Sequence, residues 1–143
     1  MYVERVTRVD ADLVSAFARL IPQLSSAGPP TEAELAEIIA APNTHLLAAR
    51  DDRAISGILT LTLYRIPTGL QARIDDAVVD ASARGHGTGE ALTQEAIRIA
   101  REAGARSIHL TSHPSREAAN RLYARLGFVR RDTNVYHLEL GIP

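Results

Sequence analysis

The sequence contains neither cysteine nor lysine. Without cysteine the chain has no disulfide, no thiolate metal ligand and no cysteine nucleophile, so any acyl transfer must avoid a cysteinyl intermediate. Because all 16 basic residues are arginine, Schiff-base catalysis through a lysine is excluded as well. Any catalysis by this chain must therefore rest on other groups.

Long apolar runs are also lacking. Residues 1–20 carry acidic and basic side chains throughout, so we expect neither a signal peptide nor a transmembrane helix, no membrane partner, and a cytoplasmic location. The formal net charge of -1 argues against general binding to nucleic acid. With 143 residues, 45% of them hydrophobic and 23% charged, the chain is typical of one globular domain over residues 1–143.

Apolar spacing and turn residues predict an α/β pattern in which strands and helices alternate in the second half. Strands are expected over residues 3–9, 45–50, 55–64, 73–80, 107–112 and 134–140, with a turn at 51–53 and a connecting loop at 65–72. Helices are expected over residues 12–20, 31–40, 88–103 and 115–126. The residues TEAE at 31–34 have the capping-box pattern, and Gly104 is a plausible helix stop. The expected packing is a mixed sheet with helices on both faces.

Three glycines in five residues, Gly85, Gly87 and Gly89, separate an apolar strand from a helix. The first N–H groups of a helix are unpaired and carry partial positive charge, which attracts phosphate oxygens. Glycines let successive N–H groups converge and leave no side chain in the way. The pattern predicts a pyrophosphate cradle, and the spacing alone leaves a tight turn without a ligand as the alternative.

Two familiar phosphate motifs do not fit this segment. A P-loop needs lysine directly after its last glycine, but Glu90 follows Gly89 and the chain has no lysine. The dinucleotide fingerprint starting at Gly85 would need a third glycine at the position of Glu90.

The residues RGHGTG at 84–89 resemble the acetyl-CoA motif of the GNAT superfamily of N-acetyltransferases, Arg/Gln-x-x-Gly-x-Gly/Ala. Arg84, Gly87 and Gly89 fill its three specified positions. The residues ANRLYARLGF at 119–128 resemble a second signature of the same superfamily, Ala-x-x-Leu-Tyr-x-x-x-Gly-Phe. The resemblance extends from about residue 74 to residue 128.

The resemblance implies a GNAT-like α/β fold with a mixed, mostly antiparallel central sheet of about six or seven strands and about four helices. It implies transfer of an acetyl group from acetyl-CoA to a primary amine by direct attack, with both substrates bound together. Proximity is then the main source of catalysis. The rival function is a non-catalytic acyl-CoA-binding sensor, and a weaker one is a nucleotide-binding domain.

The resemblance also implies which residues bind acetyl-CoA. The strand at Val78 and Val79 would bond to the pantetheine amides through main-chain atoms, as an added strand does. Arg84 would pair with a phosphate, and His86 and Thr88 would contribute their N–H groups. The full set of cofactor-binding candidates is Val78, Val79, Arg84, Gly85, His86, Gly87, Thr88, Gly89 and Asn120.

One position departs from the superfamily pattern. Arg116 lies seven residues before Tyr123, where members often have an asparagine that helps to hold the pantetheine arm. Asn120 lies nearby and is the remaining amide candidate.

The candidate catalytic residues are Tyr123, Asp75 and Asp76. An amine with a pKa near ~10.4 must lose a proton before it attacks, and one of the two aspartates, on opposite faces of the strand, is the expected acceptor. Tyr123 occupies the general-acid position of the resemblance, since a phenol with a pKa near ~10 is a suitable donor to a departing thiolate. A helix tyrosine packed in the core is the alternative for Tyr123.

The remaining predictions concern metals and partners. His109 and His113 have a four-residue spacing that aligns ligands only on a helix, whereas their segment reads as a strand, so no metal site is expected. The acceptor is expected to be a small amine, with a peptide amine as the alternative. The terminal strand at residues 134–140 suggests pairing between subunits, hence a homodimer.

Overall fold

The computed structural model describes residues 1–52 and 54–141. Its helices and strands follow one another as β1 (Tyr2–Arg5), α1 (Ala11–Leu24), α2 (Glu32–Ala40), β2 (Thr44–Arg50), β3 (Ile55–Ile66), β4 (Gly69–Val79), a 3₁₀ turn η1 (Ala81–Ala83), α3 (Thr88–Glu102), β5 (Ile108–His109) and α4 (Glu117–Arg125). No helix among the described residues is long and apolar enough to cross a bilayer.

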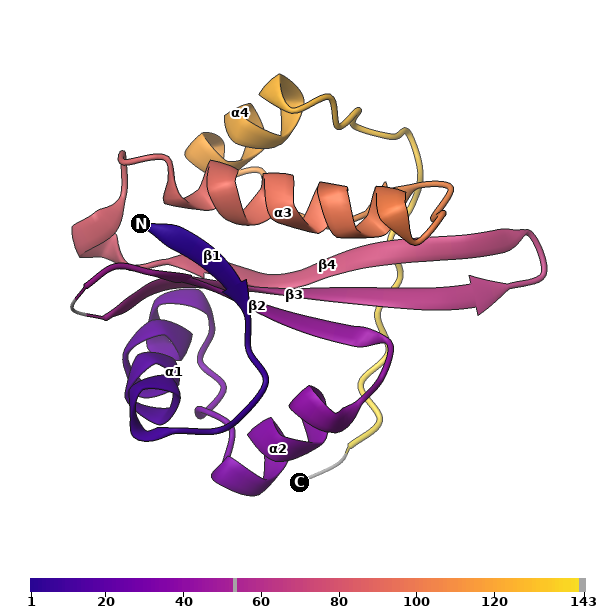
Figure 1. The fold of residues 1–143 in the computed structure, drawn as a ribbon. Coiled ribbons are helices and arrows are strands. Elements are labelled where there is room, and N and C mark those ends of the chain that lie inside the picture. Colours follow the sequence, from indigo (N-terminus) through magenta and orange to yellow (C-terminus); the bar gives the residue numbers. More distant parts are fainter. Residues whose placement is uncertain (53, 142–143) are drawn as a thin grey trace.

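A five-stranded sheet in the order β1-β2-β3-β4-β5 forms the centre of the molecule. Neighbouring strands are antiparallel except β4 and β5, which are parallel. Helices α1 and α2 cover one face of the sheet, and α3 with α4 above it covers the other (Figure 1). One apolar cluster fills each side of the sheet. The predicted mixed sheet with helices on both faces is therefore confirmed.

The predicted capping box at Thr31 and the predicted helix stop at Gly104 are both confirmed. The Thr31 hydroxyl accepts from the Glu34 N–H at 3.1 Å, and the Thr31 N–H donates to the Glu34 carboxylate at 2.9 Å. These two reciprocal bonds satisfy groups that a helix terminus leaves unpaired. Past the end of α3, Gly104 has φ +82°, the left-handed conformation in which glycine commonly ends a helix.

A β-bulge interrupts β4 just before the glycine-rich segment. Asp75 pairs with Thr60, but the next paired residue, Val78, faces Ile58, so β4 contains one extra residue here. Asp76 sits in the bulge with φ +49°, the only positive φ of a non-glycine residue in the described chain. The bulge reverses the alternation of side chains between the two faces of the sheet. As a result, Ile74 and Ala77 both pack against the apolar cluster under α3.

The predicted loop at residues 65–72 is wrong. β3 continues to Ile66 and β4 begins at Gly69, so the two strands form one long hairpin. Gly69 has φ +134°, which lets the chain turn within a few residues where the sequence suggested a longer connection. The prediction of a turn at residues 51–53 includes Arg53, which lies outside the described residues.

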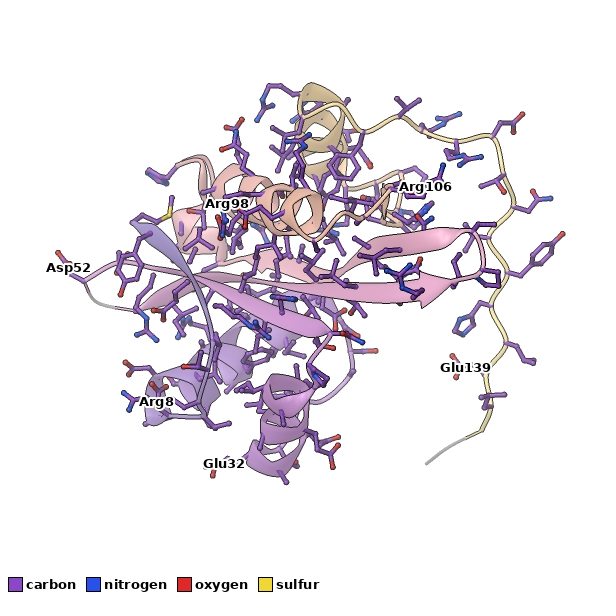
Figure 2. All side chains as sticks on the ribbon, turned by 45° about the vertical axis from the view of Figure 1, so that its right-hand side comes forward. Arg8, Glu32, Asp52, Arg98, Arg106 and Glu139 are labelled. Carbon is purple, nitrogen blue, oxygen red and sulfur yellow. The ribbon has the colours of Figure 1, made fainter. Side chains whose placement is uncertain are left out.

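The expected six or seven strands are also wrong, because the described residues form five. The strand predicted at residues 107–112 shortens to Ile108–His109, and within residues 1–52 and 54–141 the segment at 134–140 has no hydrogen-bonded neighbour that would make it a strand. Figure 2 shows the segment with Glu139 running down one side of the molecule, past the end of the β3–β4 hairpin. An alternating pattern of apolar and polar residues specifies the two faces of a strand, but the strand forms only when another segment of the chain supplies its backbone hydrogen bonds.

Candidate active site

A cleft of about 860 Å³ opens where β4 ends and α3 begins. Its walls come from α1, β4, the segment 83–89, the first turns of α3, and the residues 115–125 of α4 and the loop before it. Arg84, Gly85, Gly87, Thr88 and Gly89 all line this cleft. The structure thus brings most of the predicted cofactor-binding residues to one site.

The three glycines of this segment serve two different purposes. Gly85 and Gly87 have φ of +83° and +79°, so both adopt the left-handed conformation that other residues rarely take. A Cβ on Gly89 would lie 3.3 Å from a methyl of Leu122 and 3.6 Å from one of Val79. Two glycines therefore shape the turn, and the third allows close packing of α3 against α4 and β4.

The N-terminus of α3 faces the cleft without a side-chain cap. Gly87 is the N-cap residue, and its carbonyl accepts the first helical bond from the Ala91 N–H at 3.0 Å. The N–H groups of the preceding helical residues have no intrahelical acceptor, and glycine offers no side chain to supply one. Thr88 is 4% exposed, and its methyl group packs beside Gly57. This terminus is therefore available to an anion.

Two other predicted residues of the segment have different surroundings. Arg84 lines the cleft, and its Nε donates to the Val79 carbonyl at 3.3 Å, which orients the guanidinium. The His86 ring lies 3.2 Å from the Ala83 carbonyl and does not line the cleft. The His86 side chain therefore does not reach the cleft.

The Tyr123 ring lines the cleft from α4 and is 8% exposed. It packs edge-on against Phe128, with ring centroids 5.6 Å apart. Burial raises the pKa of the Tyr123 hydroxyl above its ordinary value of 10, and the positive charge of Arg116 partly opposes this. The hydroxyl is therefore protonated throughout the neutral range and suited to donate a proton.

Arg116 joins α4 to β4 across the cleft. It is the N-cap residue of α4, and its guanidinium donates to the Ala77 carbonyl at 3.4 Å. Asn120 does not line the cleft; its amide nitrogen instead donates to the His113 carbonyl at 3.0 Å and holds the loop before α4. The charged Arg116, not Asn120, therefore presents a side chain to this wall.

The two aspartates do not lie on simple opposite faces, because the bulge interrupts the alternation between them. The Asp75 carboxylate accepts from Arg73 Nε at 3.1 and 3.2 Å on the face of α1 and α2. Asp76 lies in the bulge, is exposed, and makes no ion pair within the described part of the chain. Neither lines the cleft, although the next residue, Ala77, does.

Comparison with known proteins shows which family this chain belongs to. Residues 13–128 match the model of the Acetyltransferase (GNAT) family. The chain belongs to the GNAT family. It is an N-acetyltransferase, and acetyltransferases of this family use acetyl-CoA as co-substrate.

Individual relatives agree with the family assignment. The acetyltransferase is 29% identical over 135 residues to glucosamine 6-phosphate N-acetyltransferase 1 of Oryza sativa subsp. japonica, covering 87% of this chain and 80% of the relative. A putative acetyltransferase from Agrobacterium tumefaciens has the same fold, with a TM-score of 0.85 at 20% identity over 97% of this chain and all of that one. The glucosamine-6-phosphate N-acetyltransferase of Arabidopsis thaliana superimposes with a TM-score of 0.81 at 16% identity, covering 95% and 96% of the two chains.

Residues that the sequence did not single out also lie at the cleft of the acetyltransferase or just before its glycine segment. Gln23 and Leu24, at the end of α1, line the cleft more than fifty residues before the glycines. Asp80 accepts from the Ser82 N–H and starts the 3₁₀ turn that leads into the glycines. Nothing in the local sequence identifies Gln23 and Leu24, because only the packing of α1 against β4 brings them there.

No group of three or more His, Asp or Glu residues is placed to hold a metal in the described regions of the acetyltransferase. His109 lies 3.1 Å from the Ser107 hydroxyl, and His113 lies 2.7 Å from the Ser115 hydroxyl. Each imidazole thus already has a local polar partner.

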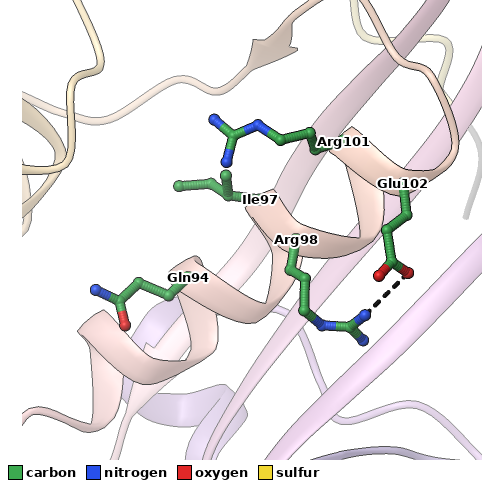
Figure 3. A pocket seen from close by; sticks show the side chains of 5 residues that line it. All are labelled: Gln94, Ile97, Arg98, Arg101 and Glu102. Carbon is green, nitrogen blue, oxygen red and sulfur yellow. Dashed lines mark ion pairs between the residues drawn. The ribbon is translucent and has the colours of Figure 1, made fainter.

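A second, shallower hollow of about 450 Å³ lies on the outer face of α3 (Figure 3). Its lining side chains are Gln94, Ile97, Arg98, Arg101 and Glu102, and Arg98 pairs with Glu102 at 2.9 Å. It contains none of the predicted site residues. Most of the predicted cofactor-binding residues line the first cleft instead.

Proposed function

We propose that this acetyltransferase binds acetyl-CoA with its pyrophosphate at the N-terminus of α3 and transfers the acetyl group directly to the primary amine of a small molecule. The observation that carries the proposal is the glycine segment. Two left-handed glycines lead into an uncapped helix N-terminus, and a third allows α3 to approach Leu122. Such a terminus provides convergent N–H donors and a favourable dipole for phosphate oxygens.

The end of β4 supports binding of the pantetheine arm. β5 pairs with β4 only at Ala72 and Arg73, whereas Val78 and Val79 pair with β3 alone among the described residues. The other edge of β4 therefore borders the cleft, and its main-chain groups are suited to bond an extended ligand as a neighbouring strand would. Arg116 already donates to the Ala77 carbonyl, so its guanidinium would lie beside the arm.

The proposed reaction needs one proton acceptor and one donor. The neutral amine nitrogen bonds to the thioester carbonyl carbon, and the carbon–sulfur bond breaks. A proton leaves the amine and another reaches the sulfur. Tyr123 is the proposed donor, since its buried hydroxyl lines the cleft and stays protonated. Asp76 or Asp75 is the proposed acceptor, acting directly or through water, because both precede the cleft-lining Ala77.

A phosphorylated amino sugar is the first acceptor to test. The rice relative is named a glucosamine 6-phosphate N-acetyltransferase and shares 29% identity over 80% of its length. The cleft walls also suit anionic groups, because the charged side chains there are the four arginines 84, 116, 121 and 125 and the two glutamates 90 and 117. This excess of positive charge favours the phosphates of both substrates.

The decisive experiment is thiol release from acetyl-CoA by the purified protein with glucosamine 6-phosphate, glucosamine, polyamines, aminoglycosides, amino acids and short peptides. Release that depends on one small amine supports the proposal. Release with peptides alone would overturn the small-molecule acceptor. CoA binding without release across the panel would favour a sensor, and preference for ATP over CoA would contradict the proposed cradle.

Asparagine variants test the aspartates separately. Asp76→Asn removes the charge while keeping a residue that tolerates positive φ, whereas alanine would add backbone strain. If Asp76 accepts the proton, Asp76→Asn lowers kcat and Asp75→Asn does not, and the reverse result assigns the role to Asp75. Unchanged kcat in both variants would exclude both carboxylates.

A further inference from the structure

The segment before the glycines is held in place from the other half of the chain. The 3₁₀ turn η1 has no buried residue, so apolar packing does not fix its position. Arg84 follows directly after η1, and the glycines follow Arg84. Whatever fixes η1 therefore also determines where the phosphate-binding segment lies relative to β4.

Two polar residues of α1, Arg19 and Gln23, reach this turn. They are four residues apart, which places them on one face of the helix. The Gln23 amide nitrogen donates to the Arg19 carbonyl at 3.2 Å, and its amide oxygen accepts from the Ala81 N–H at 2.9 Å. Gln23 thus bonds directly to the backbone of η1 and also lines the cleft.

Asp80 connects both residues to the end of β4. Its Oδ2 accepts from Arg19 Nε at 2.8 Å, and its Oδ1 accepts from the Ser82 N–H at 3.2 Å and from Gln23 Nε2 at 3.4 Å. The Asp80 side chain is 15% exposed, so water screens this ion pair less than an ordinary surface pair. These bonds hold the pKa of the Asp80 carboxyl below its usual value, with the Ser82 N–H as the largest contributor.

Arg19 also extends the contact to β3. Its second guanidinium nitrogen donates to the Ile55 carbonyl at 2.6 Å, and the neighbouring Ser56 carbonyl accepts from the Asp80 N–H at 2.8 Å. One side chain of α1 therefore binds the start of β3 and the end of β4 together. We call the three residues Arg19, Gln23 and Asp80 the clasp.

We propose that the clasp positions the phosphate-binding segment, so that α1 determines how tightly the acetyltransferase binds acetyl-CoA. The clasp residues are positioning residues, since they act through the backbone of residues 80–89 and not on the reacting atoms. The inference rests on the proposed function of the glycine segment. A displaced segment weakens the alignment of its N–H groups with a pyrophosphate, while the groups around Tyr123 keep their places.

The test compares Arg19→Met and Asp80→Asn with the matched variant Arg50→Met. Arg50 also links α1 to the sheet, through ion pairs with Glu4 at 2.9 Å and Asp12 at 3.3 Å, but it does not contact η1. We expect the Kd for CoA and the KM for acetyl-CoA to rise about tenfold in the two clasp variants. The kcat should stay within about twofold of the parent, and Arg50→Met should change melting temperature alone.

Two further variants extend the test, and the first of them stays informative if Arg19→Met folds poorly. Gln23→Met removes the bond to the Ala81 N–H with little change in volume, and it should also weaken CoA binding. In the double variant Arg19→Met with Asp80→Asn, the loss should be smaller than the product of the two single losses, because both remove the same contact. A fully multiplicative loss, or an unchanged Kd in every clasp variant, would overturn the proposal.

Hydrogen exchange of the ligand-free protein separates this inference from the proposed function. If the parent protein does not bind CoA, the proposed function fails, but the clasp is still tested. Backbone amides of residues 81–89 should exchange faster in Arg19→Met than in Arg50→Met. Equal exchange in the two variants would show that the clasp does not position the segment.

Discussion

At the residue scale, two glycines with the same backbone conformation allow an effect on stability to be distinguished from an effect on cofactor binding. Gly87 and Gly104 have φ of +79° and +82°, and an added Cβ would meet nothing within 4 Å at either position. Alanine should therefore cost each a similar 1–2 kcal/mol, roughly the penalty of the left-handed conformation. Only Gly87 lies in the cleft.

The expected result is similar melting temperatures for Gly87→Ala and Gly104→Ala, with a raised KM for acetyl-CoA in Gly87→Ala alone. Thermal unfolding and steady-state kinetics check this. An equal KM in both variants would mean that residue 87 has no part in binding the cofactor.

Tyr123 is the second residue whose role is open to a direct test. Tyr123→Phe keeps the ring that packs on Phe128 and removes only the hydroxyl. We expect kcat to fall by about 10²-fold with little change in KM or stability, as for loss of a general acid. Tyr64→Phe, on the distant part of β3, is the control and should leave kcat unchanged.

The pH dependence of kcat follows from the raised pKa of Tyr123. The acid form is the active donor, so it persists at all pH values below a pKa that lies above 10. Loss of this proton should therefore not lower kcat between pH 7 and about pH 9. A fall in that range that Tyr123→Phe abolishes would contradict the assignment.

At the element scale, α2 offers a prediction about stability alone. Thr31→Ala removes the hydroxyl that accepts from the Glu34 N–H and should lower the free energy of unfolding by about 1 kcal/mol. No residue of α2 lines the cleft, so kcat and KM should not change. Chemical denaturation and the thiol-release assay check both parts. A change in KM would show that α2 communicates with the site.

The capping box of Thr31 and Glu34 also predicts that the stability of the protein depends on pH. Hydrogen bonds from Thr31 lower the pKa of Glu34 below its ordinary value of 4.5, so the folded state favours the charged form. The stabilisation is present above that value and is lost as the pH falls through the folded pKa. Glu34→Gln should therefore destabilise the protein at pH 7 but much less at acid pH, and denaturation curves at the two pH values measure the difference.

At the scale of the whole molecule, the segment after α4 leaves large apolar side chains exposed to solvent. Val135, Tyr136, Leu138 and Leu140 are 73–88% exposed, and β5 is an edge strand of the sheet. We expect this segment to pair with the sheet edge of a second copy, as the alternating pattern suggested.

Light scattering coupled to gel filtration tests this homodimer. The parent chain should elute as a dimer, and Leu138→Glu with Leu140→Glu should elute as a monomer. Ile66→Glu, which changes a 41% exposed residue at the end of the long hairpin, is the control and should stay dimeric. A parent chain that is monomeric at all concentrations would contradict the prediction.

The sequence by itself determined the approximate positions of the four helices, the cap at Thr31 and the glycine segment, because each depends on residues a few positions apart. The capping box at Thr31 and the left-handed stop at Gly104 are local in this sense. The RGHGTG and ANRLYARLGF motifs are likewise local and indicate the GNAT family from sequence alone.

Only the tertiary structure decided what depends on pairing between distant segments. The bulge at Asp76 results from the register between β3 and β4, and it changes where both aspartates lie. Gln23 and Arg19 reach the cleft and η1 because α1 packs on the sheet beside β4. The strand count fell to five because residues 134–140 have the alternating pattern of a strand but no partner within the described chain. Local spacing specifies which face of an element is apolar, whereas hydrogen-bond partners and side-chain neighbours depend on how the whole chain folds back on itself.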